Sequence, residues 1–132
     1  MATKTVAEKL LIKPNTTVWA SDASRIDLIQ PLPLHVRSVE GLDQAETALI
    51  FADDAASLRA ILTAHREQLT LPATIWVAYP KANRADINRD SVWPIVGEYG
   101  LRPIGQVAVD GVWSALRFRP LKEGEAPFTG GR

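Results

Sequence analysis

The stretch Leu11-Ile-Lys-Pro-Asn-Thr-Thr-Val-Trp-Ala-Ser-Asp22 decides how the fold of this sequence is interpreted. Its first residues form a turn, and the segment from Thr16 to Ala20 is rich in Thr, Val and Trp, which favour a pleated, half-buried strand. A turn followed by a buried strand is the usual opening of an α/β domain. We therefore expect the first strand of a mainly parallel sheet here.

The turn after this strand contains no glycine. It is Ser21-Asp22-Ala23-Ser24-Arg25. In nucleotide-binding α/β domains this turn is normally glycine-rich, which lets a cofactor approach the backbone closely. Side chains at Ser21, Asp22 and Ala23 would obstruct a pyrophosphate or a methionine carboxylate. We therefore expect the scaffold without its usual cofactor loop, and no cofactor.

Length and composition narrow the class of protein. The 132 residues suffice for one domain with a hydrophobic core. Fifteen basic and fifteen acidic residues give zero formal net charge, which disfavours a nucleic-acid binder and eases self-association. The absence of cysteine excludes disulfides, thiolate catalysis and zinc–cysteine sites. No apolar run approaches membrane-spanning length and the start has no signal core, so we expect a cytoplasmic protein without membrane contact.

Apolar runs and turn signals predict the remaining elements. Glu46–Ala52 and Thr74–Tyr79 are nearly continuous apolar runs, typical of strands covered on both faces. Weaker patterns predict helices at 23–29, 55–69 and 91–99, and strands at 34–39, 104–109 and 112–118, the last two joined at Asp110-Gly111. The order predicts a three-layer α/β domain over 10–120, with a C-terminal antiparallel hairpin, a flexible 1–9 and a disordered tail at 121–132.

An α/β sheet closed by a terminal hairpin resembles the class I methyltransferase architecture, a Rossmann-like fold, over residues 10–120. Leu11-Ile-Lys-Pro-Asn15 before a Val-containing strand is similar to that superfamily's entry turn. The resemblance implies a cofactor loop at Ser21 to Arg25, where the glycines are missing. It also implies a ribose-binding acid at the end of the second strand, where Glu40 is the only candidate.

Three segments resemble a group of small bacterial proteins of unknown function. They are Ile12-Lys-Pro14, Val77-Ala-Tyr-Pro-Lys81 and Trp113-Ser-Ala-Leu-Arg-Phe118. This second resemblance implies the same fold and brings no activity with it.

Ligands of open α/β sheets bind beyond the carboxyl ends of the strands. The candidate ligand-binding residues are those that follow the first, third and fourth strands: Ser21, Asp22, Asp53, Tyr79, Lys81, Arg84, Asn88 and Arg89. The long loop from Tyr79 to Asp90 is the best candidate, because its basic residues could hold an anionic group near a helix start. The alternative, that Asp86 and Asp90 neutralise these cations in a solvated surface loop, is favoured.

Other polar and aromatic residues are better explained by structure. One of Asp53 and Asp54 is needed to cap the next helix, and no spacing of His, Asp and Glu completes a metal site. His65 lies on the stripe of a helix at the edge of the core. Trp93 and Trp113 are interpreted as packing residues. We assign no catalytic residue, because no serine lies in a Gly-x-Ser-x-Gly context.

The leading functional hypothesis is a non-catalytic binding or regulatory module. Its partner would be a small anionic ligand or a protein, and a homodimer through a sheet edge or the hairpin is a further candidate. The arginines of the last strand, Arg117 and Arg119, would form a solvated edge or a partner surface. The alternative is an atypical S-adenosylmethionine- or nucleotide-dependent transferase that uses the loop after the fourth strand. Whether the protein is an enzyme stays open.

Overall fold

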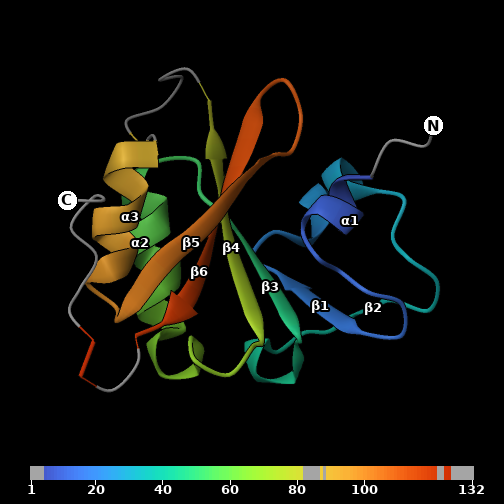
Figure 1. Ribbon diagram of the computed structural model, residues 1–132, viewed down its shortest axis with the longest axis horizontal. Helices are drawn as coiled ribbons and strands as arrows, with labels where there is room; N and C mark the ends of the chain where they lie inside the picture. The colour runs from blue at the N-terminus through green and yellow to red at the C-terminus, as the bar shows by residue number, and fades with distance from the viewer. Residues whose placement is uncertain (1–4, 82–86, 88, 122–123, 126–132) are drawn as a thin grey trace.

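The computed structural model describes residues 5–81, 87, 89–121 and 124–125, with one six-stranded sheet between two layers of helices (Figure 1). The strands are β1 (Thr17–Ala20), β2 (Arg37–Ser38), β3 (Thr47–Phe51), β4 (Thr74–Pro80), β5 (Leu101–Ala108) and β6 (Trp113–Pro120). The helices are α1 (Val6–Lys9), α2 (Ala55–Ala64) and α3 (Arg89–Gly97), with 3₁₀ turns η1 (Ala23–Ile29), η2 (Leu42–Gln44) and η3 (Arg66–Gln68).

The sheet has the order β2-β1-β3-β4-β6-β5. The first four strands in this order are parallel, and β6 and β5 form the antiparallel hairpin. Asp110 closes the hairpin turn, because its carboxylate accepts the backbone N–H groups of Val112 and Trp113, each at 2.7 Å. The predicted α/β class, with a mainly parallel sheet and a terminal hairpin, is confirmed.

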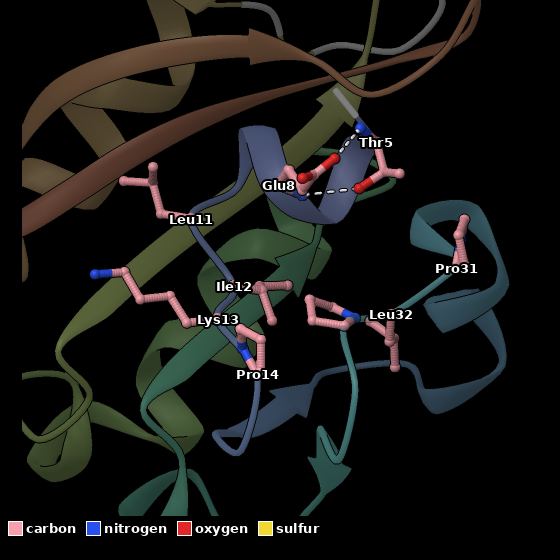
Figure 2. Close-up of a pocket in the computed structure, with 9 residues that line it drawn as sticks. Thr5, Glu8, Leu11, Ile12, Lys13, Pro14, Pro31 and Leu32 are labelled. Atoms are coloured by element: carbon pink, nitrogen blue, oxygen red, sulfur yellow. Dashed lines mark hydrogen bonds between the residues drawn. The ribbon is translucent and has the colours of Figure 1, made fainter. Parts of the chain in front are cut away.

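The face of the sheet under α1 and η1 is closed by the N-terminal segment. Thr5 and Glu8 form a capping box at the start of α1, a signal that Thr-x-x-Glu carries in the sequence. Leu10 is 1% exposed, and its carbonyl accepts the indole N–H of Trp76 on β4 at 2.9 Å. A pocket of about 540 Å³ lies between this segment and the Pro31–Pro33 loop (Figure 2).

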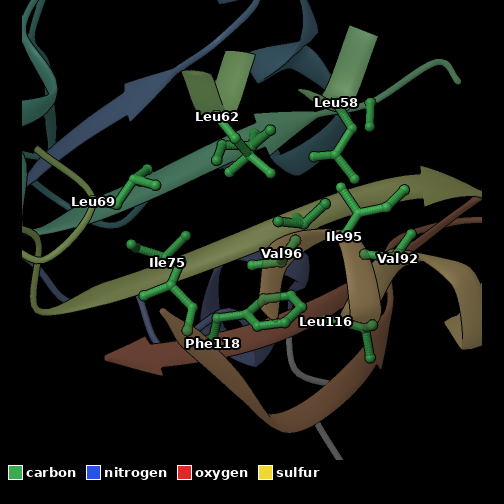
Figure 3. Close-up of a cluster of buried hydrophobic side chains, with 14 of the residues drawn as sticks. Leu58, Leu62, Leu69, Ile75, Val92, Ile95, Val96, Leu116 and Phe118 are labelled. Atoms are coloured by element: carbon green, nitrogen blue, oxygen red, sulfur yellow. The ribbon is translucent and has the colours of Figure 1, made fainter. Parts of the chain in front are cut away.

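The opposite face carries the larger cluster of buried side chains, under α2 and α3 (Figure 3). Leu58 and Leu62 of α2 are fully buried there, as are Val92 and Val96 of α3. They pack over apolar residues of β3, β4 and β6, among which Phe118 is the largest fully buried side chain. This double cover explains why Glu46–Ala52 and Thr74–Tyr79 are apolar throughout.

Several elements differ from their predicted form, three of them clearly. The strand expected at 34–39 is only Arg37–Ser38, because His35 has a φ of 63° and Leu34 is 70% exposed at the sheet's edge. The helix expected at 55–69 ends at Ala64 and continues as η3. The last strand was expected to present its arginines at a solvated edge, but β6 lies between β4 and β5. The edge is β5, which tolerates Pro103 because an edge strand leaves N–H positions unpaired.

Asp54 is the residue that caps α2. Its carboxylate accepts the N–H of Ser57 at 2.7 Å, and the Ser57 hydroxyl accepts the N–H of Asp54 at 3.1 Å. We expect Asp54→Ala to lower the free energy of unfolding by about 1 kcal/mol, because the first turn loses its acceptor. Urea denaturation measures this. Asp27→Ala, at an exposed acid of η1, is the control, and an equal loss in both variants would contradict the capping role.

Candidate functional site

The carboxyl ends of β1, β3 and β4 meet at one edge of the sheet, since the three strands are parallel. The beginning of β6 lies at the same edge, because β6 is antiparallel to β4 and Trp113 is paired with Pro80. Figure 1 shows the turn between β5 and β6 at the end of the molecule toward which β4 points. Residues that follow β1 and β3 and the first residue of β6 are thereby neighbours.

Ser21, directly after β1, ties that strand to β3. Its backbone N–H donates to the carbonyl of Leu49 at 2.9 Å, and its hydroxyl oxygen accepts the N–H of Phe51 at 2.8 Å. The pairing of β1 with β3 therefore continues beyond β1 through a side chain. A glycine at this position could not provide the second bond, so Ser21 has a structural reason to replace one.

Arg25 of η1 lies across this edge between two carboxylates. Its Nη2 is 2.7 Å from Oδ1 of Asp53, which follows β3, and its Nε is 3.3 Å from Oδ2 of Asp22, which follows β1. The centre of its guanidinium lies 4.9 Å from the centroid of the Trp113 ring. Nη1 is buried without a hydrogen-bond acceptor among the residues that the structure describes. The guanidinium of Arg25 is thus held against the indole of Trp113 by two carboxylates, and its Nη1 has no acceptor among the described residues.

The ionised carboxylate of Asp22 is stabilised by hydrogen bonds from Ser24 in the same turn. The hydroxyl of Ser24 donates to Oδ1 of Asp22 at 2.6 Å and the Ser24 N–H donates at 3.1 Å. The hydroxyl bond is the main reason that the pKa of Asp22 lies below its usual value, with the backbone bond and the charge of Arg25 adding to it. Asp22 therefore stays ionised at neutral pH. Its contribution to stability is lost only as the pH falls through this lowered pKa.

Trp113 is half-buried and fixed by its neighbours. Its ring meets the ring of Phe51 edge-on, with centroids 6.0 Å apart and an interplanar angle of 85°. One face of the indole is left to the guanidinium of Arg25. Trp113 packs, as the sequence suggested, but it also forms a wall of the site.

The predicted ligand-binding residues lie in different parts of the molecule. Ser21, Asp22 and Asp53 lie together at the edge just described. Tyr79 is 3% exposed and lies in the core, where its hydroxyl accepts a hydrogen bond from Gln106 at 3.0 Å. Lys81 is half-buried, and its backbone N–H donates to Val112 at 2.7 Å.

The rest of the predicted loop site is largely outside the described residues. Arg84, Asn88 and Asp86 lie in this undescribed part, and Arg89 is described only as the first residue of α3. The hypothesis of an anion site or a self-neutralised loop therefore stays a prediction. In the part of the chain that is described, no three His, Asp or Glu side chains could hold a metal ion. No described helix has the length and apolar character needed to cross a bilayer.

Glu40 is the residue for which the resemblance to methyltransferases implies a ribose-binding role. It follows β2 after Val39, whose N–H donates to the carbonyl of Val18 at 2.9 Å. Since β2 and β1 are parallel, Glu40 is at the carboxyl end of the sheet, and it is exposed.

Arg25 is a site residue that no sequence pattern indicates, because it is only one residue of a turn without glycine. Its partners are 28 and 88 positions further along the chain, as its contacts with Asp53 and Trp113 show.

No protein-family model and no curated protein matches the chain, but solved structures do. A protein of the NADB-Rossmann superfamily from Streptococcus agalactiae has a TM-score of 0.59 at 10% identity, over 98% of this chain and 72% of that one. A proposed tRNA (m1A22) methyltransferase from Streptococcus pneumoniae, in complex with S-adenosyl-L-methionine, has a TM-score of 0.56 at 11% identity, over 95% and 73%. The m1A22 tRNA methyltransferase of Bacillus subtilis has a TM-score of 0.52 at 12% identity, over 92% and 68%.

These likenesses show a Rossmann-like, methyltransferase-type fold. They also correct the leading functional hypothesis. We expected a non-catalytic binding or regulatory module because the turn after β1 lacks glycine. The similar structures include methyltransferases in complex with S-adenosyl-L-methionine or with bound SAH, so the alternative, a cofactor-dependent transferase, fits better.

Proposed function

We propose that the protein is an S-adenosylmethionine-dependent methyltransferase that binds its cofactor across the carboxyl ends of β2, β1 and β3. The observation that supports this most is the cation held by Asp22 and Asp53 against Trp113. S-adenosylmethionine carries two positive groups, a sulfonium and an ammonium. Carboxylates and an aromatic face are the partners that such groups prefer.

The residues at this edge fit the cofactor in chemical type. Asp22 and Asp53 supply acceptors for its cations, and Trp113 supplies a flat apolar wall. Glu40 supplies a carboxylate for the ribose hydroxyls. The turn Ser21-Asp22-Ala23 gives little of the close backbone contact that glycines allow, so side chains take a larger share of the binding.

The bound cofactor would supply a methyl group on a positively charged sulfur. The residues of the chain would bind and orient it, and the indole of Trp113 would limit the access of water from the hairpin side. The acceptor of the methyl group is proposed not to be nucleic acid, because the formal net charge of the chain is zero. We also propose that the protein is cytoplasmic. We further propose that it forms a homodimer, which light scattering tests by measuring the molar mass in solution.

Calorimetry with S-adenosylmethionine and S-adenosylhomocysteine tests the proposal. We expect both to bind with micromolar dissociation constants. Glu40→Gln should weaken binding about tenfold, because a neutral amide replaces a charged acceptor of two hydroxyls. Asp43→Asn, at an exposed acid of η2, is the control and should bind like the unaltered protein.

Two results would count against it. If neither compound binds, the proposed function is wrong. If both bind and Glu40→Gln matches the control, the cofactor is bound but Glu40 does not hold its ribose.

A further inference from the structure

A charged pocket lies at the end of the sheet opposite to the proposed cofactor-binding end. Its volume is about 320 Å³, near the lower limit of small-molecule sites, about 300 Å³. It lies at the beginning of β3 and β4, and its polar lining residues are Lys13, Thr16, Glu46, Thr47, Thr74 and Arg117. The proposed function does not involve these residues.

Arg117 is the central residue of this pocket. It comes from β6, an interior strand, where it lies opposite Trp76 on one side and Gly105 on the other. Its Nε is buried, and none of the described residues offers this atom an acceptor. An arginine in an interior strand is unusual, and a buried charged donor without an acceptor is costly. A bound anion would supply the acceptor that Nε of Arg117 lacks.

Lys13 brings a second positive charge to the same pocket. Figure 2 shows its side chain extending away from Pro31 and Leu32, on the same side as Leu11, which also lines both pockets. Within the described parts of the chain, no ion pair is formed by Lys13 or Arg117. Glu46 is the one carboxylate among the lining residues, so the pocket has an excess of one positive charge.

We propose that this pocket binds a small oxyanion, a phosphate or a carboxylate group, between Arg117 and Lys13. A guanidinium matches two oxygens of such a group, and a lysine adds a point charge. The threonine hydroxyls at the strand starts suit the same group as further donors. This site is independent of the proposed methyltransferase function, because it lies at the other end of the strands.

Titration with sodium phosphate and with sodium acetate, against sodium chloride at equal ionic strength, tests the proposal. Two-dimensional NMR follows the amides of Thr47, Thr74 and Arg117. We expect saturable shifts confined to the pocket. Arg117→Met should weaken the binding of the preferred anion about tenfold, and Lys13→Met should weaken it by a smaller factor. Glu46→Gln should strengthen it about threefold, because a like charge is removed.

The controls separate this site from general charge effects. Arg59→Met removes an arginine of α2, on the other face of the sheet, and should leave the titration unchanged. Arg117→Lys keeps the charge if the methionine variant does not fold, and should bind more weakly than the unaltered protein. The proposal is wrong if neither anion gives saturable shifts. It is equally wrong if Arg117→Met and Arg117→Lys bind like the control, or if Glu46→Gln weakens binding.

Discussion

Phe118→Ala is expected to lower the free energy of unfolding by about 3–5 kcal/mol, the range found when a buried aromatic side chain is truncated. Phe118 is 1% exposed and lies on the face of β6 that α2 and α3 cover (Figure 3). It is paired with Ile75 on β4 and with Pro103 on β5. The buried cluster to which it belongs includes residues of β3, β4, α2 and α3. These elements would have to move together to fill the cavity.

Urea denaturation followed by tryptophan fluorescence measures this loss, with the slope of the transition checked for two-state behaviour. The control is Leu34→Ala, which removes an apolar side chain that is 70% exposed, and should change stability by less than about 0.5 kcal/mol. A loss in Phe118→Ala below about 1 kcal/mol would show that the two helices are not packed on this face as described.

The layered fold could be predicted because burial leaves a local pattern. Glu46–Ala52 and Thr74–Tyr79 are apolar at consecutive positions, and only a strand covered on both faces requires this. Asp110 closes the hairpin that was expected at Asp110-Gly111. Each of these features depends on residues close together in the chain, and the structure confirms them.

The strands at and near the two edges of the sheet were predicted less accurately than the central strands. The strand expected at 34–39 has an alternating pattern, but the residues before it leave the extended conformation and only two residues pair with β1. The order of β5 and β6 in the sheet was also missed, because hairpin geometry alone does not say which strand joins β4. The interior position went to β6, the more buried of the two strands, in which Leu116 and Phe118 are 4% and 1% exposed.

The position of the candidate site could be predicted from the sequence, but the full set of residues that form it could not. Ser21, Asp22 and Asp53 lie at the carboxyl ends of β1 and β3, a position that follows from strand direction alone, and their binding of a ligand stays a prediction. Arg25 could not be selected, because nothing near it in the chain shows that Asp53 and Trp113 will surround it. The absence of glycine indicates how closely a ligand can approach the backbone, and by itself it does not exclude a cofactor.

Arg25→Met is expected to raise the affinity for S-adenosylmethionine about tenfold if the cofactor binds as proposed. The guanidinium of Arg25 occupies the space between Asp22, Asp53 and Trp113 that the cofactor's cations would need. Its two ion pairs and its contact with the indole are worth about 1–2 kcal/mol together at a partly exposed site. A protein in which only about a tenth of the molecules are open binds with a tenfold weaker apparent affinity.

The same substitution should reduce stability slightly while it improves binding. Arg25→Met removes those contacts from the free protein, so its free energy of unfolding without cofactor should fall by about 1 kcal/mol. If Arg25 competes with the cofactor, its substitution should raise the affinity for S-adenosylmethionine and lower the free energy of unfolding. A residue that holds the cofactor would lose affinity on substitution, and a bystander would leave it unchanged.

Calorimetry with two ligands separates competition by charge from competition by bulk. S-adenosylmethionine carries the sulfonium and the ammonium, whereas 5′-methylthioadenosine carries neither. Arg25→Met should therefore improve the binding of the first much more than that of the second. Arg25→Lys, which keeps the charge, should remain close to the unaltered protein, and Arg59→Met serves as the control for loss of an ion-paired arginine. An equal gain for both ligands would mean that the side chain only fills space, and a weaker affinity of Arg25→Met for S-adenosylmethionine would show that Arg25 is part of the binding site.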